Sequence, residues 1–80
     1  MTRDEILAKL ADIIREETAY RGEISEDMRL LEDIGTDSLQ LMDIVAAAEA
    51  TFDIVIPDEE LLSMKRVKDA VDYVESALTR

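Results

Sequence analysis

Ser38 is the residue of this 80-residue chain whose type and position best suit chemistry. Asp37 and, three residues later, Gln40 form a D-x-x-Q capping box, which predicts a helix with Ser38 as its first residue. Because Asp37 supplies the cap, the hydroxyl of Ser38 stays free beside backbone N–H groups that lack partners. This setting favours an attached phosphate ester, since a helix N-terminus stabilises an anion. The alternative is a serine that only occupies the start of a helix and takes part in no chemistry.

Nothing in the sequence would turn Ser38 into an enzyme nucleophile. The chain has no His and no Cys, and its lysines are Lys9, Lys65 and Lys68. These absences exclude a Ser-His-Asp triad, a thiolate nucleophile, a disulfide framework and a Cys/His zinc site within the chain. A D-x-[DN]-x-[DN]-G calcium loop is absent as well. We therefore expect a protein that is not itself an enzyme and that holds no metal.

The acidic residues are concentrated in the middle of the chain. The formal charge is −11, from 20 acidic and 9 basic residues. Residues 30–64 contain nine acids and no base, so the other 45 residues hold eleven acids and all nine bases. Such a segment is suited to positively charged partners, although a solvated acidic face that only maintains solubility is the alternative. Binding to nucleic acid or to anionic membranes needs basic faces and is excluded.

The apolar pattern gives no sign of a membrane segment. The longest uninterrupted apolar run is residues 44–48, whereas a spanning helix needs about 20 residues. The first residues, Met-Thr-Arg-Asp-Glu, contain acids where a signal peptide needs an apolar stretch. We expect a cytoplasmic protein that does not insert into membranes.

The elements that must position Ser38 are predicted to be helices in a single domain, residues 1–80. Thr2 and Glu5 form a T-x-x-E capping box for a first helix at about 3–17, and a long connection follows over 19–36. The second helix spans about 38–51, a short one begins with Pro57 in its first position, and the last begins near Val67. The expected fold is all-α: a small four-helix bundle with three longer helices, one short helix and a long loop between the first two.

The residues expected to be buried recur at helical spacing or anchor the connections. They are Ile6, Leu7, Leu10, Ile13 and Ile14; Ile24, Met28, Leu30, Leu31 and Ile34; Leu41, Ile44, Val45, Ala48 and Phe52; Leu61, Leu62 and Met64; and Val67, Ala70, Val71, Val74 and Leu78. Leu39 and Met42 fall beside the second helix's stripe, so they are candidates either for a partner contact or, for Met42, for the core.

One cluster contradicts the usual placement of charge. Lys65, Arg66 and Lys68 stand at the start of the last helix, where the helix dipole disfavours cations, and no Ser, Thr, Asp or Asn at 65 or 66 can cap it. Pairing with residues 58–60, Asp69 or Asp72 would explain the cluster. The other reading is contact with something negative.

Three segments together resemble acyl carrier proteins. Residues 31–39 read LEDIGTDSL, like the attachment signature of that family; Phe52 and residues 54–60, IVIPDEE, match further downstream, and residues 67–74 read VKDAVDYV. A lone D-S-L triplet would be weak evidence. With the downstream segment, the length, the acidity and the helical pattern, the resemblance covers residues 3–78 and is specific.

The resemblance implies that 4′-phosphopantetheine, derived from coenzyme A, is attached to Ser38 and holds acyl groups as thioesters. It also implies partners with basic patches: a phosphopantetheinyl transferase, acyltransferases, ketosynthases and other acyl-handling enzymes. By match to the family's docking helix, Asp37, Asp43 and Glu49 are expected electrostatic contacts, and Leu39 and Met42 apolar ones. A monomer is expected.

Several positions depart from the fatty-acid carriers. Gln40 and Ala50 stand where those carriers usually have acids, residues 46–48 are all alanine, and Lys65-Arg66 replace small polar residues. These departures favour polyketide or specialised fatty-acyl biosynthesis over housekeeping fatty-acid synthesis. A peptidyl or aminoacyl carrier is one alternative, although such carriers are typically less acidic around the serine. A cofactor-free acidic adaptor is the other.

Overall fold

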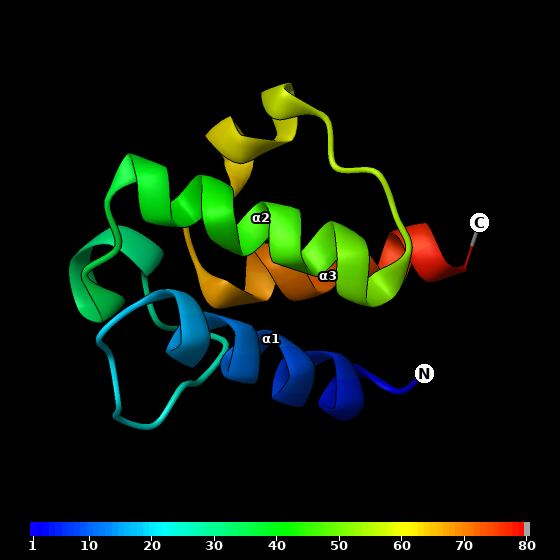
Figure 1. The fold of residues 1–80 in the computed structure, drawn as a ribbon. Helices are drawn as coiled ribbons and strands as arrows, with labels where there is room; N and C mark the ends of the chain where they lie inside the picture. Colours follow the sequence, from blue (N-terminus) through cyan, green and yellow to red (C-terminus); the bar gives the residue numbers. More distant parts are fainter. Residues whose placement is uncertain (80) are drawn as a thin grey trace.

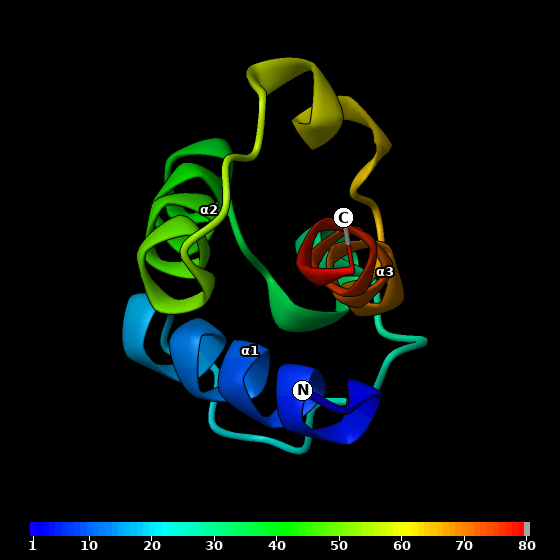
Figure 2. The same cartoon turned by 90° about the vertical axis from the view of Figure 1, so that its right-hand side faces the viewer.

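The computed structural model describes residues 1–79 and contains three long helices that surround a common core (Figure 1). They are α1 (Arg3–Glu17), α2 (Ser38–Phe52) and α3 (Val67–Leu78), and two short helices join them: the π-helix η1 (Leu30–Ile34) and the 3-10 helix η2 (Asp58–Ser63). Figure 2 shows α1 lying across the pair formed by α2 and α3, with η2 on the opposite side. The predicted all-α bundle is confirmed, and η1 is an addition within the long connection.

Local capping explains where α1 begins. The Glu5 amide donates to Thr2 Oγ1 at 3.2 Å, and the Thr2 amide donates to Glu5 Oε1 at 2.8 Å, which completes the predicted capping box. The bond from the Thr2 backbone lowers the pKa of Glu5. The helix then buries Ile6, Leu10 and Ile14 on one face. The predicted range of 3–17 is confirmed.

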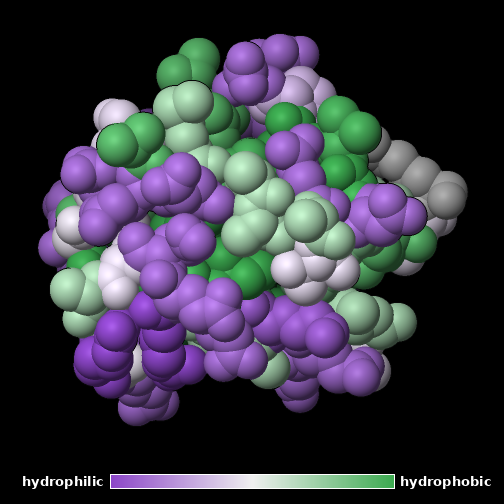
Figure 3. Space-filling model, in the orientation of Figure 1, coloured by the Kyte–Doolittle hydropathy of each residue, from purple (hydrophilic) through white to green (hydrophobic). Residues whose placement is uncertain are grey.

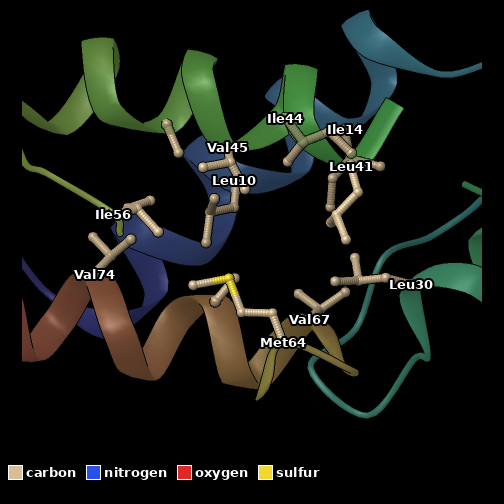
Figure 4. Close-up of a pocket in the computed structure, with 12 residues that line it drawn as sticks. Leu10, Ile14, Leu30, Leu41, Ile44, Val45, Ile56, Met64, Val67 and Val74 are labelled. Atoms are coloured by element: carbon tan, nitrogen blue, oxygen red, sulfur yellow. The ribbon is translucent and has the colours of Figure 1, made fainter. Parts of the chain in front are cut away.

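The core is built from branched aliphatic side chains of all three long helices. Figure 4 shows Leu10 and Ile14 of α1, Val45 of α2 and Val74 of α3 pointing into one space, with the thioether of Met64 among them. An apolar cavity of about 20 Å³ remains there, close to the volume that one water molecule needs. Since only apolar side chains line this cavity, a water molecule there would lack hydrogen-bond partners.

The connection between α1 and α2 is packed by its own side chains, as predicted. Ile24, Leu30 and Ile34 are buried in it. Its backbone is also bonded to the segment before α3: the Leu30 amide donates to the Lys65 carbonyl, and the Val67 amide to the Met28 carbonyl, both at 2.9 Å. The connection that leads into α2 is therefore held by contacts with a part of the chain about 35 to 39 residues away in sequence.

Three apolar residues predicted to be buried are exposed. Leu62 is 81% exposed, and Leu31 and Leu78 are exposed as well. The buried positions nearby are taken by Leu30 in η1 and by Met64 directly after η2, whereas Leu31 and Leu62 point outwards. Leu78 lies in the last turn of α3, where the bundle ends.

The boundaries of the later helices differ slightly from the prediction. Pro57 occupies the N-cap position of η2 rather than its first helical position. The helix α2 ends at Phe52, one residue beyond the expected end. Differences of this size are usual at frayed helix ends.

Candidate functional site

Ser38 is the first residue of α2, and its side chain is exposed. Asp37 caps the helix: its Oδ1 accepts from the Gln40 amide at 2.7 Å, and the Asp37 amide donates to Gln40 Oε1 at 3.1 Å. Within residues 1–79, neither the Ser38 hydroxyl nor the amides of Ser38 and Leu39 have a hydrogen-bond partner. The geometry therefore presents a free hydroxyl beside two free donors at the positive end of a helix.

The three residues before Ser38 hold it in place. Gly35 ends η1 with a φ of 85°, a left-handed conformation that residues with a side chain rarely adopt. Thr36 is buried, and its Oγ1 and its amide both donate to the Leu30 carbonyl, at 2.9 and 3.1 Å. These contacts fix the turn before α2, and α2 begins at the end of the bundle opposite both termini (Figure 1).

The exposed face of α2 combines apolar and acidic side chains. Leu39 is 68% and Met42 56% exposed, whereas Ile44 and Val45 point into the core. Met42 therefore lies outside the core, so the alternative interpretation of Met42 as a core residue is wrong. Asp43 is exposed and forms no ion pair within the described part of the chain. Figure 3 shows hydrophobic residues among hydrophilic ones over the upper half of this view, where Figure 1 has α2 and η2.

Comparison with known proteins identifies the family. Residues 8–74 match the sequence model of the family described as phosphopantetheine attachment site. The chain belongs to the acyl carrier proteins. It is 46% identical to the acyl carrier protein of Renibacterium salmoninarum and 44% identical to that of Kocuria rhizophila, in each case over 95% of both chains. With the acyl carrier protein of Myxococcus xanthus it shares 42% identity over 95% of this chain and 98% of the other.

Solved structures agree with this assignment. The crystal structure of the acyl carrier protein from Thermotoga maritima superposes with a TM-score of 0.85, at 31% identity over 96% of this chain and 91% of that one. The acyl carrier protein of Enterococcus faecalis gives a TM-score of 0.78, at 32% identity over 96% and 99% of the two chains. The fold and the family are thus established by independent comparisons.

The prosthetic group of this acyl carrier protein is 4′-phosphopantetheine. The start of α2 fits a phosphate ester. The Ser38 hydroxyl is exposed there, and within residues 1–79 neither this hydroxyl nor the amides of Ser38 and Leu39 have a hydrogen-bond partner, so all three groups are available. Within residues 1–79, no group of three His, Cys, Asp or Glu side chains is arranged to hold a metal ion. No described helix has the length and apolarity needed to cross a membrane.

Two of the acids predicted to contact partners of this carrier also have structural bonds. Asp37 caps α2, as described above, and Glu49 is half-buried, with Oε2 accepting from the Ile56 amide at 2.9 Å. Glu49 therefore holds the segment between α2 and η2 against α2. Of the three predicted acids, Asp43 alone has no hydrogen bond or ion pair from its side chain within the described residues.

The basic cluster of the carrier is not explained by pairing. No ion pair joins Lys65, Arg66 or Lys68 to another residue of the described chain. Asp69 instead caps α3, because its Oδ2 accepts from the amides of Lys65 and Arg66 at 3.0 and 2.9 Å. Of the two explanations for the cluster, pairing with residues 58–60, Asp69 or Asp72 is therefore not found in the described chain. The sequence signal for this cap was an acid three residues after Arg66, the second half of a capping box.

Proposed function

We propose that this protein holds acyl intermediates as thioesters on a 4′-phosphopantetheine arm esterified to Ser38 and presents them to partner enzymes. This proposal rests on the Ser38 hydroxyl at the first position of α2. The hydroxyl is exposed, has no hydrogen bond within residues 1–79 and lies inside the segment that matches the attachment family. The chain has no Cys, so the arm supplies the only thiol. It also has no His, which suits a carrier whose thioester must survive until an enzyme acts on it.

Mass spectrometry tests the attachment directly. The protein is produced together with a broad phosphopantetheinyl transferase and digested, and the peptide that contains Ser38 is weighed. A gain of one phosphopantetheine on this peptide supports a carrier. An unmodified peptide favours the acidic adaptor. Loading with a panel of acyl and aminoacyl groups then separates an acyl carrier from a peptidyl or aminoacyl carrier.

The pathway and setting are part of the same proposal. Gln40, Ala50 and the alanines at 46–48 make α2 less acidic and smaller than in housekeeping fatty-acid carriers, which favours polyketide or specialised fatty-acyl biosynthesis. The partners would then be acyltransferases and ketosynthases as well as the transferase. We propose that residues 1–80 act as one carrier domain, monomeric and in the cytoplasm.

We propose that partners dock on the exposed face of α2, where Leu39 and Met42 offer apolar area and Asp37, Asp43 and Glu49 offer negative charge. Asp43 is the acid best placed for this role, because Asp37 and Glu49 already accept backbone hydrogen bonds. A basic patch on the partner would complement the nine acids of residues 30–64.

Met42→Ala should weaken the transferase reaction without weakening the fold. Removing an exposed apolar anchor that a partner buries costs about 1–3 kcal/mol of binding, mostly through faster dissociation. The transferase kcat/KM is measured beside the Tm. Ile44→Ala, at a buried position two residues along α2, is the control and should lower the Tm by several degrees. A Met42→Ala variant with a normal kcat/KM would show that partners do not bury this side chain.

Asp43→Lys should slow association with the transferase at low ionic strength, by about 2- to 10-fold, and have little effect in high salt. The physical reason is that exposed charges mainly steer the encounter and contribute little to equilibrium binding. Glu16→Lys changes the net charge equally on an exposed position of α1 and should have a smaller effect. If the Asp43→Lys defect is the same at every salt concentration, steering is not its cause.

A further inference from the structure

A basic surface with two exposed leucines lies at the end of the bundle where α2 and α3 both begin (Figure 1). Its six exposed residues are Arg29, Leu31, Leu62, Lys65, Arg66 and Lys68. Five of them line one hollow in the protein surface, and Lys68 lies in the first turn of α3. We call this set the basic-apolar face. None of its side chains belongs to the core, so the face is open to a partner.

Backbone pairing holds the two arginines of this face side by side. Arg29 and Arg66 form an antiparallel bridge between the connection that precedes α2 and the segment that precedes α3. Two hydrogen bonds of 2.9 Å close the bridge, and one of them runs from the Leu30 amide to the Lys65 carbonyl. The cations therefore stand on a fixed frame. A partner that binds them would not have to order this backbone, which lowers the cost of binding.

The charges of the basic-apolar face oppose stability. Like charges directly opposite each other across a bridge are destabilising, as are cations in the first turn of a helix. Arg29 is neutralised by Glu32 and by Asp33, at 3.1 Å from the latter. The other three cations form no ion pair within residues 1–79. Local conflicts of this kind are expected where residues serve a function at the expense of stability.

The three cations without ion pairs have donors to offer. Within the described residues, the exposed ammonium groups of Lys65 and Lys68 have no hydrogen-bond partner. The Arg66 guanidinium donates to the Asp27 carbonyl at 2.6 Å through Nη1. Its remaining N–H groups stay available, because a guanidinium has five. Arginine is also enriched among the residues that contribute most to protein interfaces, where it pairs with carboxylates.

Charge complementarity indicates the kind of partner. Nucleic acids and anionic membranes carry negative charge over a wide area, so the formal charge of −11 on the whole chain repels them. An acidic segment of a folded protein is much smaller, and at physiological ionic strength charges farther apart than about 8 Å are largely screened. Such a segment would meet the local cations without the full repulsion of the chain. Leu31 and Leu62 add apolar area for a side chain of the same segment.

We infer that the basic-apolar face docks an acidic segment of a partner protein. Lys65 and Arg66 pair with its carboxylates, and Leu62, which is 81% exposed, is covered by one of its apolar side chains. This chemistry is opposite in sign to that of the exposed face of α2, which suits basic partners. Figure 2 shows α2 and α3 on different sides of the core, so partners of opposite surface charge would select different faces of the carrier.

Two synthetic peptides test the preference for negative charge. One is a short glutamate-rich peptide with a leucine at its centre, and the matched control has lysine in place of each glutamate. Each is titrated into the isotope-labelled full-length protein, with and without the arm, and amide NMR shifts are followed. The glutamate peptide should shift the amides of Leu62, Lys65 and Arg66. The lysine peptide should leave these amides in place and shift those of α2 instead.

Three variants show which side chains bind the glutamate peptide. Lys65→Gln should weaken binding by about 2- to 5-fold. Leu62→Ala should weaken it by about 2- to 10-fold, an effect that charge attraction alone would not produce. Lys9→Gln makes the same charge change at an exposed position of α1 and should leave binding unchanged. Both substituted side chains of the face are exposed, so the Tm should stay within about 2 °C.

The inference is wrong if the glutamate peptide shifts no amide of the face, if Lys9→Gln weakens binding as much as Lys65→Gln, or if Leu62→Ala has no effect. Phosphatidylglycerol vesicles and a single-stranded oligonucleotide are titrated in parallel. A stronger response of the face to either of these would overturn a protein partner in favour of a membrane or a nucleic acid. The peptide titration does not depend on attachment at Ser38, whose failure would appear separately as a missing mass gain.

Discussion

Ser38→Ala is expected to abolish attachment of 4′-phosphopantetheine completely while leaving the helical bundle intact. The substitution removes the oxygen that would form the ester, and no other group in the chain replaces it at the start of α2. The fold should be unaffected, because the Ser38 side chain is exposed and has no hydrogen bond within residues 1–79, and because the cap comes from Asp37. Exposed substitutions of this kind usually change stability by less than about 0.5 kcal/mol.

The protein is incubated with the transferase and coenzyme A, and its intact mass is then measured. Circular dichroism of the same sample reports its helical content. Ser63→Ala is the matched control, since Ser63 is an exposed serine in η2 whose hydroxyl donates to the Glu60 carbonyl. This control should load normally. A Ser38→Ala protein that still gains the mass of the arm would contradict the assignment of Ser38.

Ile14→Ala is expected to lower the free energy of unfolding substantially. Ile14 is 2% exposed and lines the apolar cavity between the three long helices, so truncation would enlarge an existing void of about 20 Å³. Such truncations cost about 2–5 kcal/mol. For 80 residues the whole free energy of unfolding is about 4–12 kcal/mol, so the Tm should fall by at least about 10 °C.

Thermal and denaturant unfolding of Ile14→Ala measure this loss. Val55→Ala removes two methyl groups from a side chain that is 76% exposed and should leave the Tm within about 2 °C. If the two variants lose equal stability, the packing around the cavity does not depend on Ile14.

The sequence was most informative about where helices begin. Capping boxes at Thr2 and Asp37 involve partners only three residues away, so they can be read without knowing the fold. The apolar spacing in α1, α2 and α3 was equally local, and it identified Ile14, Val45 and Val71 as core residues. The η1 helix was missed, because a five-residue π-turn has too few residues to show a period.

The sequence by itself determined the all-α class, the position of Ser38 at a helix start and the acidic middle segment, because each depends on residue types and short spacing. The tertiary structure decided which leucines are buried: Leu30 packs inside, while Leu31 and Leu62 are exposed. It also decided that Lys65 forms no ion pair within residues 1–79, where Asp69 accepts hydrogen bonds from the backbone amides of Lys65 and Arg66 instead. Burial and pairing depend on which distant segments meet, and a contact across 35 residues, such as that between Leu30 and Lys65, has no periodic signal in the sequence.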